Sequence, residues 1–216
     1  MAHEIRNPLA SISGSIEILK DELVSSAQNQ QLMGIVLREV NHLNTLIADF
    51  LLFARPFSPG KEEIHLNRLI EEILQMFTRG PDFNRRIRLE TQFEDDLHIQ
   101  GDPHQIRQVF WNLLINAAQA MPEGGALRVE LRKNSSPPAS SGDRIFGEIS
   151  VIDSGTGIGE DEREKIFDPF YTTKERGTGL GLSIVHSIVE GYGGKVTVQS
   201  EPGQGTTFSV FLPLYP

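Results

Sequence analysis

The sequence of 216 residues contains no cysteine, which excludes a disulfide framework. It also lacks an apolar run long enough to cross a membrane, and it shows no signal peptide. Basic residues are fewer than acidic ones, 20 against 29, and the resulting net charge of −9 disfavours nucleic-acid binding. These absences favour a cytoplasmic protein of two modest domains, with any membrane attachment supplied by a region outside this chain.

Glycine-rich segments are the most informative feature that is present. The segment 167–182, FDPFYTTKERGTGLGL, combines a polar run with closely spaced glycines at the expected start of a helix. Such a backbone can approach a ligand closely, and a helix start offers N–H groups, so the segment predicts a phosphate-binding seat. A second glycine-rich segment, DSGTGIG at 153–159, follows a strand-like run at 149–152.

An asparagine pair precedes both segments on a helix predicted from about Asp102 to Met121. The apolar residues of this helix recur at helical spacing and should form its buried stripe: Ile106, Val109, Phe110, Leu113, Ala117 and Met121. Asn112 and Asn116 lie four residues apart, so they project from one face at the border of that stripe. They are either surface amides of a well-packed helix or oxygen ligands for Mg²⁺. The glycine-rich segments downstream favour the second interpretation.

The beginning of the chain, HEIRNPL at 3–9, opens a helix with a heptad pattern. Its apolar positions alternate spacings of four and three: Ile5, Leu9, Ile12, Ile16, Leu19 and Leu23. His3 and Asn7 then point away from this seam. A similar pattern predicts a second helix over about 29–54, with Asn29 as its N-cap and a polar turn at 25–28 before it. Such a hairpin is too small to bury both stripes, so a four-helix bundle with a second copy is expected.

Taken in order, these motifs resemble the catalytic core of sensor histidine kinases. The ATP-binding part of that family belongs to the superfamily of gyrase, the Hsp90 chaperones and MutL. HEIRNPL is similar to the family's phosphoacceptor box, and the asparagine pair, DSGTGIG, IFDPF and GTGLG are similar to its nucleotide-binding boxes. The sequences of two segments around these boxes, FWNLLINAAQAMPEGG and FDPFYTTK, are most similar to those of the nitrogen-regulation branch of the family.

The resemblance implies roles for individual residues. Asp153 would accept a hydrogen bond from the adenine amino group, Asn116 with Asn112 would hold Mg²⁺, and the backbone at 179–181 would bind phosphates. The ATP-binding residues implied by the boxes, besides these three, are Gly155, Gly157, Ile158, Phe167, Phe170, Thr172, Thr173, Lys174, Gly177, Thr178, Gly179, Leu180, Gly181 and Leu182. Lys174 and Arg176, in the family's mobile lid, either reach the terminal phosphate or are solvated loop charges.

The identity of residue 112 bears on the reaction. Hydrolytic members of the superfamily place a glutamate there to activate water, whereas the amide of Asn112 cannot accept that proton. The expected nucleophile is His3, whose neutral imidazole carries a lone pair for in-line attack on phosphorus. Glu4 can accept a hydrogen bond from its other ring nitrogen. Asn7 is either a solvated helix residue or, as in the family, the residue that positions water against the phospho-aspartate of the regulator.

The other histidines lack such neighbours in the sequence. They show no metal-ligand spacing among themselves: His42, His65, His98, His104 and His186. The only metal expected from the sequence is therefore Mg²⁺, bound together with ATP.

The predicted fold is α+β. A helical hairpin at 1–55 forms the dimeric four-helix bundle, a linker spans 56–65, and a two-layer α/β sandwich that binds ATP occupies 66–216. The expected function is autophosphorylation of His3 followed by transfer to an aspartate in the receiver domain of a response regulator. Two alternatives stay open: another ATPase or serine kinase of the superfamily, and a scaffold or phosphatase module that binds nucleotide without transferring phosphate. Because His3 is almost N-terminal, the chain is expected to be a fragment of a longer protein.

Overall fold

The computed structural model describes residues 12, 14 and 16 and residues 27–53, 62–94, 96–134, 145–174 and 177–215. Its largest element is a five-stranded sheet in the order β2-β4-β5-β7-β6. The strands are β2 (Ile87–Phe93), β4 (Gly125–Asn134), β5 (Phe146–Asp153), β6 (Lys195–Glu201) and β7 (Gly205–Pro213). β2 pairs with β4 in parallel, and the remaining pairs are antiparallel.

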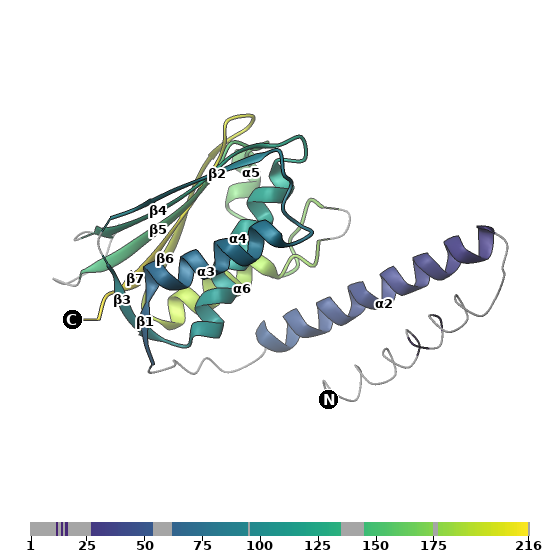
Figure 1. The fold of residues 1–216 in the computed structure, drawn as a ribbon, viewed down its shortest axis with the longest axis horizontal. Helices are drawn as coiled ribbons and strands as arrows, with labels where there is room; N and C mark the ends of the chain where they lie inside the picture. Colours follow the sequence, from purple (N-terminus) through teal and green to yellow (C-terminus); the bar gives the residue numbers. More distant parts are fainter. Residues whose placement is uncertain are drawn as a thin grey trace.

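Helices cover one face of this sheet (Figure 1). They are α3 (Leu66–Arg79), α4 (Pro103–Ala120) and α6 (Gly181–Gly191), with the short α5 (Glu160–Arg163) near the end of β5. α4 lies between α3 and α6 and contacts both, and its apolar stripe packs on β5 and β7. The core between the layers includes Phe77, Phe110, Leu127, Val151 and Val185, all essentially without solvent exposure. The predicted two-layer sandwich is thus confirmed, as are the helix expected from about Asp102 to Met121 and the strand expected at 149–152.

A second sheet of two strands joins β1 (Glu62–His65) to β3 (His98–Gly101). Ile64 and Ile99 are register partners in this antiparallel pair, and both side chains are buried in the main core. The predicted linker at 56–65 therefore contains four residues that form a strand, while the division of the chain into domains stays a prediction. We call the elements from β1 to β7 the sandwich domain.

The long helix α2 (Ala27–Phe53) projects away from the sandwich domain, and its later part lies beside α6 (Figure 1). The predicted second helix is confirmed, but it begins at Ala27, so Asn29 is not its N-cap and residues 27 and 28 are not part of a turn. Ile12 and Ile16 are helical, as predicted. The motif at 3–9, with His3, Glu4 and Asn7, lies outside the described residues. Among those described, no helix combines the length and apolar character that a membrane crossing requires.

A buried carboxylate stabilises the central strand. Glu148 on β5 accepts hydrogen bonds from Nε and Nη2 of Arg132 at 2.9 and 3.0 Å and from Nδ2 of Asn134 at 2.8 Å. Burial alone would raise the pKa of Glu148, but the hydrogen bonds and the charge of Arg132 outweigh it, and the pKa lies below its usual value. The ionised pair therefore contributes stability above the unfolded-state pKa of glutamate and loses it as the pH falls.

We predict that Arg132→Met destabilises the protein by about 1.5–3 kcal/mol at neutral pH, the range for a hydrogen bond to a charged group. Urea titrations from pH 7 to pH 3 should show the difference shrinking toward acid, because protonated Glu148 no longer needs the guanidinium. Arg128→Met is the matched control on the same strand, since its carboxylate partners are more exposed and such pairs contribute at most about 1 kcal/mol. Equal losses in both variants at all pH values would contradict the assignment.

Candidate functional site

A cavity of about 670 Å³ opens between α4, the segment that follows β5, the segment before α6 and strand β7. Its volume lies in the range of about 300–1,000 Å³ that is usual for small-molecule sites. The apolar part of its lining comes from side chains of four different regions: Ile115, Ile158, Ile166, Leu182 and Phe208. Polar residues surround this part, so the cavity can take a ligand with a flat apolar portion and a charged portion.

The cavity brings together most of the residues singled out in the sequence. Those that line it are Asn112, Asn116, Asp153, Gly157, Ile158, Thr172, Thr173, Lys174, Gly177, Thr178, Gly179, Gly181 and Leu182. Gly155, Phe167, Phe170 and Leu180 are outside the lining. Arg176 lies outside the described residues.

Asp153 is the buried acceptor of the site. It is the last residue of β5, and its side chain is almost completely buried. Oδ1 accepts a hydrogen bond from the N–H of Gly155 at 2.8 Å, and the backbone of Thr206, its register partner on β7, donates a second one. Burial raises the pKa of Asp153, and the two backbone donors and the charge of Lys174 act in the opposite direction.

A hydroxyl network supports this acceptor from behind. The hydroxyl of Ser200 on β6 lies 2.9 Å from that of Thr206 and donates to the carbonyl of Gly205 at 2.9 Å. The same hydroxyl accepts from the N–H of Ile158 at 2.8 Å. The segment that follows β5 is therefore anchored to the sheet, which fixes both the carboxylate and the apolar wall beside it.

Two glycines of the predicted boxes are required by close packing. A Cβ at Gly155 would come within 2.6 Å of the carbonyl oxygen of Ala120 and 2.7 Å of its Cβ, so only glycine lets the chain pass against the end of α4. Gly179 has a φ of +67°, and a Cβ there would collide with the backbone of Phe170. The N–H of Phe170 donates to the carbonyl of Gly179 at 2.9 Å, which joins the two ends of the segment at 170–179.

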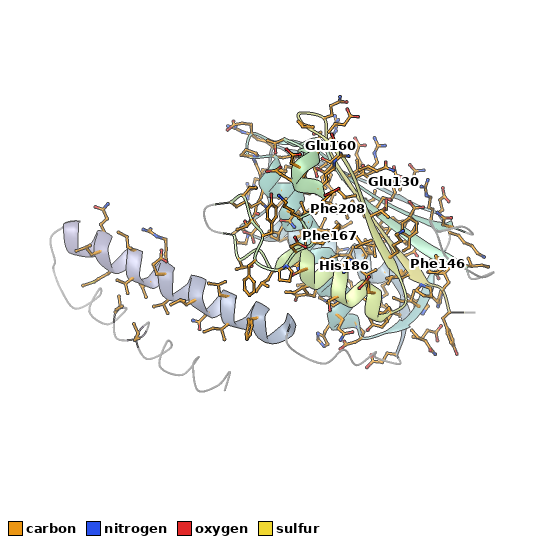
Figure 2. The ribbon with its side chains drawn as sticks, turned by 180° about the vertical axis from the view of Figure 1, so that it is seen from behind. Glu130, Phe146, Glu160, Phe167, His186 and Phe208 are labelled. Carbon is orange, nitrogen blue, oxygen red and sulfur yellow. The ribbon has the colours of Figure 1, made fainter. Side chains whose placement is uncertain are left out.

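Three further residues predicted in the boxes, Phe167, Phe170 and Leu180, are outside the lining of the cavity. Phe167 lies behind the cavity wall, with its ring centroid 6.5 Å from that of Phe208 in an edge-on arrangement and 5.4 Å from that of His186 (Figure 2). Phe170 is 59% exposed and has a φ of +67°. Leu180 is fully buried, and it precedes α6 as its N-cap. These three residues are outside the cavity lining, and their part in ATP binding stays a prediction.

The start of α6 points main-chain groups at the cavity. Gly181 and Leu182, the first residues of the helix, both line it, and no side chain caps the helix start among the residues described. The first N–H groups of an α-helix have no intrahelical acceptor and carry the positive end of its dipole. Together with the backbone of Thr178 and Gly179, this arrangement suits an anionic group such as a phosphate.

The asparagine face of α4 holds a cation. Nζ of Lys174 donates to Oδ1 of Asn116 at 2.8 Å and to Oε1 of Gln119 at 2.5 Å. Asn112 donates from Nδ2 to the carbonyl of Gly181 at 3.1 Å, so its amide is oriented by the start of α6. Amide oxygens that converge on an ammonium group are also suitable ligands for a hard metal ion. The donor set on this face therefore fits Mg²⁺.

The position of Lys174 at the cavity wall lowers the pKa of its ammonium group. The residue as a whole is exposed, but its ammonium group is enclosed by the amides, and this desolvation lowers its pKa, while the charge of Asp153 acts in the opposite direction. A cation that is partly desolvated at a cavity wall is available to an incoming anion.

Sequence reasoning missed several lining residues. These are Gln108, Trp111, Ile115, Gln119, Ala120, Thr156, Glu162, Ile166, Tyr171, Thr206 and Phe208. A signal was present for most of those on α4, because Gln108, Ile115, Gln119 and Ala120 each lie three or four residues from a member of the asparagine pair and share its face. Thr206 and Phe208 have no local signal, since they reach the site only through the pairing of β7 with β5.

A helix-covered sheet with a polar and apolar cavity at this place defines a nucleotide-binding domain. The family described as "Histidine kinase-, DNA gyrase B-, and HSP90-like ATPase" matches residues 101–216, and the "His Kinase A (phospho-acceptor) domain" matches residues 1–56. The chain therefore belongs to the histidine kinase family and contains the catalytic core of a sensor histidine kinase.

Curated relatives agree with this assignment. The sensor histidine kinase ZraS of Escherichia coli K12 is 38% identical over 215 residues, which cover 99% of this chain and 44% of ZraS. AtoS of the same organism is 36% identical over 217 residues, covering 100% and 34%. The chain thus spans less than half the length of these relatives. The more specific likeness to the nitrogen-regulation branch stays a prediction.

Solved structures resemble the whole chain. Full-length ShkA in complex with AMPPNP aligns over 99% of this chain and 44% of ShkA, with a TM-score of 0.73 and 25% identity. Histidine kinase ThkA in complex with the response regulator protein TrrA aligns over 100% of this chain and 60% of ThkA, with a TM-score of 0.70 and 30% identity. Both comparisons include the helical part as well as the sandwich domain.

We predict that Asp153→Asn weakens ATP binding by about 1–3 kcal/mol, because a charged acceptor is replaced by a group that also donates. This corresponds to a loss of about fivefold to 150-fold in affinity by calorimetry. Because burial raises the pKa of Asp153, the ionised carboxylate destabilises the nucleotide-free fold above that pKa, so the variant should unfold at an unchanged or higher temperature. Asp161→Asn, at an exposed residue outside the lining, is the control. Unaltered ATP affinity in Asp153→Asn would exclude the adenine contact.

Proposed function

We propose that this chain is the core of an ATP-dependent protein-histidine kinase, in which ATP phosphorylates His3 and the phosphoryl group then passes to an aspartate of a response-regulator receiver domain. The observation that carries the proposal is the cavity beside α4, in which an amide, Asn112, stands where a hydrolase needs a carboxylate. Because an amide cannot accept a proton from water, a nucleotide site with Asn112 at this place is expected to use a nucleophile from another part of the protein.

ATP binding is assigned to opposite sides of the cavity. Adenine would lie against the apolar wall of Ile158 and Phe208, with its amino group donating to Asp153. The phosphates would lie at the start of α6, against the backbone of Gly179 and Gly181. Support comes from the buried, backbone-held carboxylate at one side and the uncapped helix start at the other.

Magnesium is assigned to the asparagine face of α4. Asn116 would be the main protein ligand, with Asn112 and Gln119 nearby, and the ion would neutralise charge on the transferred phosphoryl group. Support comes from the amide oxygens that already hold the ammonium group of Lys174. That ammonium and a metal ion cannot share the same oxygens, so Lys174 must leave them when the metal binds. It is then free to reach the terminal phosphate.

The acceptor side of the reaction is assigned to the motif at 3–9. His3 would attack in line through one ring nitrogen, and Glu4 would accept a hydrogen bond from the other and stabilise the positive charge that develops. Asn7, one helical turn after His3, would orient water for dephosphorylation of the regulator. The match of residues 1–56 to the phospho-acceptor domain supports this assignment.

Partners are inferred from the helical part. Leu32, Ile35, Leu43 and Phe50 on α2 are large apolar side chains exposed in a single chain, which supports burial against a second copy in a four-helix bundle. The likeness to ThkA in its complex with TrrA supports a response regulator as the acceptor. A scaffold or phosphatase module without kinase activity is the remaining alternative, and phosphoryl transfer separates it from the proposal.

We expect incubation with γ-labelled ATP and Mg²⁺ to leave a label on the chain that is labile in acid and stable in alkali. His3→Gln should abolish the label and leave ATP affinity unchanged, whereas His104→Gln, a substitution of an exposed histidine on α4, should keep it. An acid-stable label would indicate a hydroxyl acceptor, and steady release of phosphate without label would indicate an ATPase. ATP binding with neither would favour the scaffold alternative.

Asn116→Ala should abolish magnesium-dependent transfer while the fold remains intact, because the amide is outside the apolar stripe of α4. Calorimetry should show that Mg²⁺ no longer strengthens ATP binding, although affinity in EDTA is unchanged. Asn116→Asp, which keeps an oxygen ligand, is the matched variant and should still respond to Mg²⁺.

Mixing the Asn116→Ala chain with the His3→Gln chain restores labelling only if transfer occurs between subunits. A normal rate in Asn116→Ala would refute the metal assignment.

A further inference from the structure

A group of potential metal-ligating side chains lies on the small sheet of β1 and β3, at the end of the sandwich domain away from α5 (Figure 1). His65 and His98 are register partners across the two antiparallel strands. Glu63 precedes His65 by two residues, so the strand period places it on the same face. Three potential ligands, two from β1 and one from β3, therefore project from one surface.

The distances within this group suit a shared ion. One ligand atom from each of Glu63, His65 and His98 lies within 4.8 Å of the others. Nδ1 of His98 is 2.9 Å from Oε1 of Glu63, and the two imidazole rings are 4.0 Å apart between centroids with a tilt of 57°. Ligands at about 2.0–2.2 Å from a tetrahedral zinc ion are separated by about 3.3 Å. Small side-chain rotations would bring the three atoms to that spacing.

A fourth side chain supplies the outer contacts that such sites use. Oδ2 of Asp96 lies 3.4 Å from Nε2 of His98 and 3.8 Å from Nδ1 of His65. Histidine ligands commonly donate their second ring N–H to a carboxylate, which fixes the tautomer and the ring orientation. With Nδ1 of His98 facing the ion, Asp96 accepts from Nε2.

The group is accessible and its backbone is fixed. The side chains of Glu63, His65 and Asp96 are 57, 54 and 67% exposed, and that of His98 is 27% exposed. Their opposite strand faces are buried through Ile64 and Ile99. The neighbouring backbone is tied to α3, since the N–H of Leu66 donates to the carbonyl of Leu97 at 2.8 Å and Asn67 Oδ1 accepts from the N–H of Leu97 at 3.0 Å.

We propose that Glu63, His65 and His98 form a binding site for a divalent transition-metal ion of the zinc class, with Asp96 orienting the imidazole of His98 and water completing the coordination. Two imidazoles select zinc, copper or nickel over magnesium, which prefers oxygen ligands alone. The ion would join β1 to β3. β1 is the first strand of the sandwich domain, so a metal ion that holds it to β3 would stabilise the start of that domain.

The test uses the whole chain, freed of metals with a chelator and without nucleotide. Titration with zinc chloride should give one site per chain by calorimetry, and the unfolding temperature should rise with zinc. His65→Ala and His98→Ala should each lower the zinc affinity at least as strongly as Asp96→Ala, for which loss of an outer contact predicts about tenfold to 100-fold. Magnesium chloride at the same concentrations should not bind at this site.

Matched controls are two other histidines of the sandwich domain. His104→Ala removes an exposed histidine at the start of α4, and His186→Ala removes one that lies 3.4 Å from Glu190 on α6. Both should leave zinc binding unchanged. Absence of zinc binding, or equal affinity in the cluster variants and the controls, would overturn the proposal and leave the group as a hydrogen-bonded surface cluster. Circular dichroism of the zinc-free variants checks that their fold is intact.

Discussion

The site depends on a carboxylate that is buried at the end of the central strand. Asp153 can remain there because the backbone of Gly155 and Thr206 donates to it, and both donors exist only if the chain turns sharply after β5 and β7 pairs in register. The turn requires the missing Cβ of Gly155 against Ala120, at the end of α4. One polar group thus couples the sheet, the first glycine segment and the helix that carries the asparagine pair.

Local patterns predicted what depends on local sequence. The helix predicted from about Asp102 to Met121 follows from its apolar period, and Asn112 and Asn116 share the cavity because a helix places residues four apart on one face. Contacts that depend on pairing between distant strands could not be predicted. Thr206 reaches Asp153 through the register of β5 with β7, and His65 meets His98 through that of β1 with β3. β1, a four-residue strand, is too short for a period to reveal.

Charge explains how an acidic protein can present a site for an anion. The chain has a net charge of −9, so long-range attraction does not favour ATP. Attraction must come from short-range groups: the start of α6 and the ammonium of Lys174, whose desolvation lowers its pKa and whose bonds to Asn116 and Gln119 keep it at the cavity wall. A cation held by neutral amides can be exchanged for another without leaving an unpaired charge behind. Because Asn116 and Gln119 are neutral, the position of Lys174 is compatible with the proposed metal site.

The two proposed cation sites differ in the chemistry of their donors. The face of α4 offers the amide oxygens of Asn116 and Gln119, which suit a hard ion that keeps its waters and shares phosphate oxygens. The β1–β3 sheet offers two imidazole nitrogens and a carboxylate, which favour a borderline ion. Because imidazole is absent from the lining of the nucleotide cavity within the described part of the chain, and because the β1–β3 group lies at the other end of the domain, each ion has a preferred location. Zinc bound at the surface site would therefore leave magnesium at the nucleotide in place.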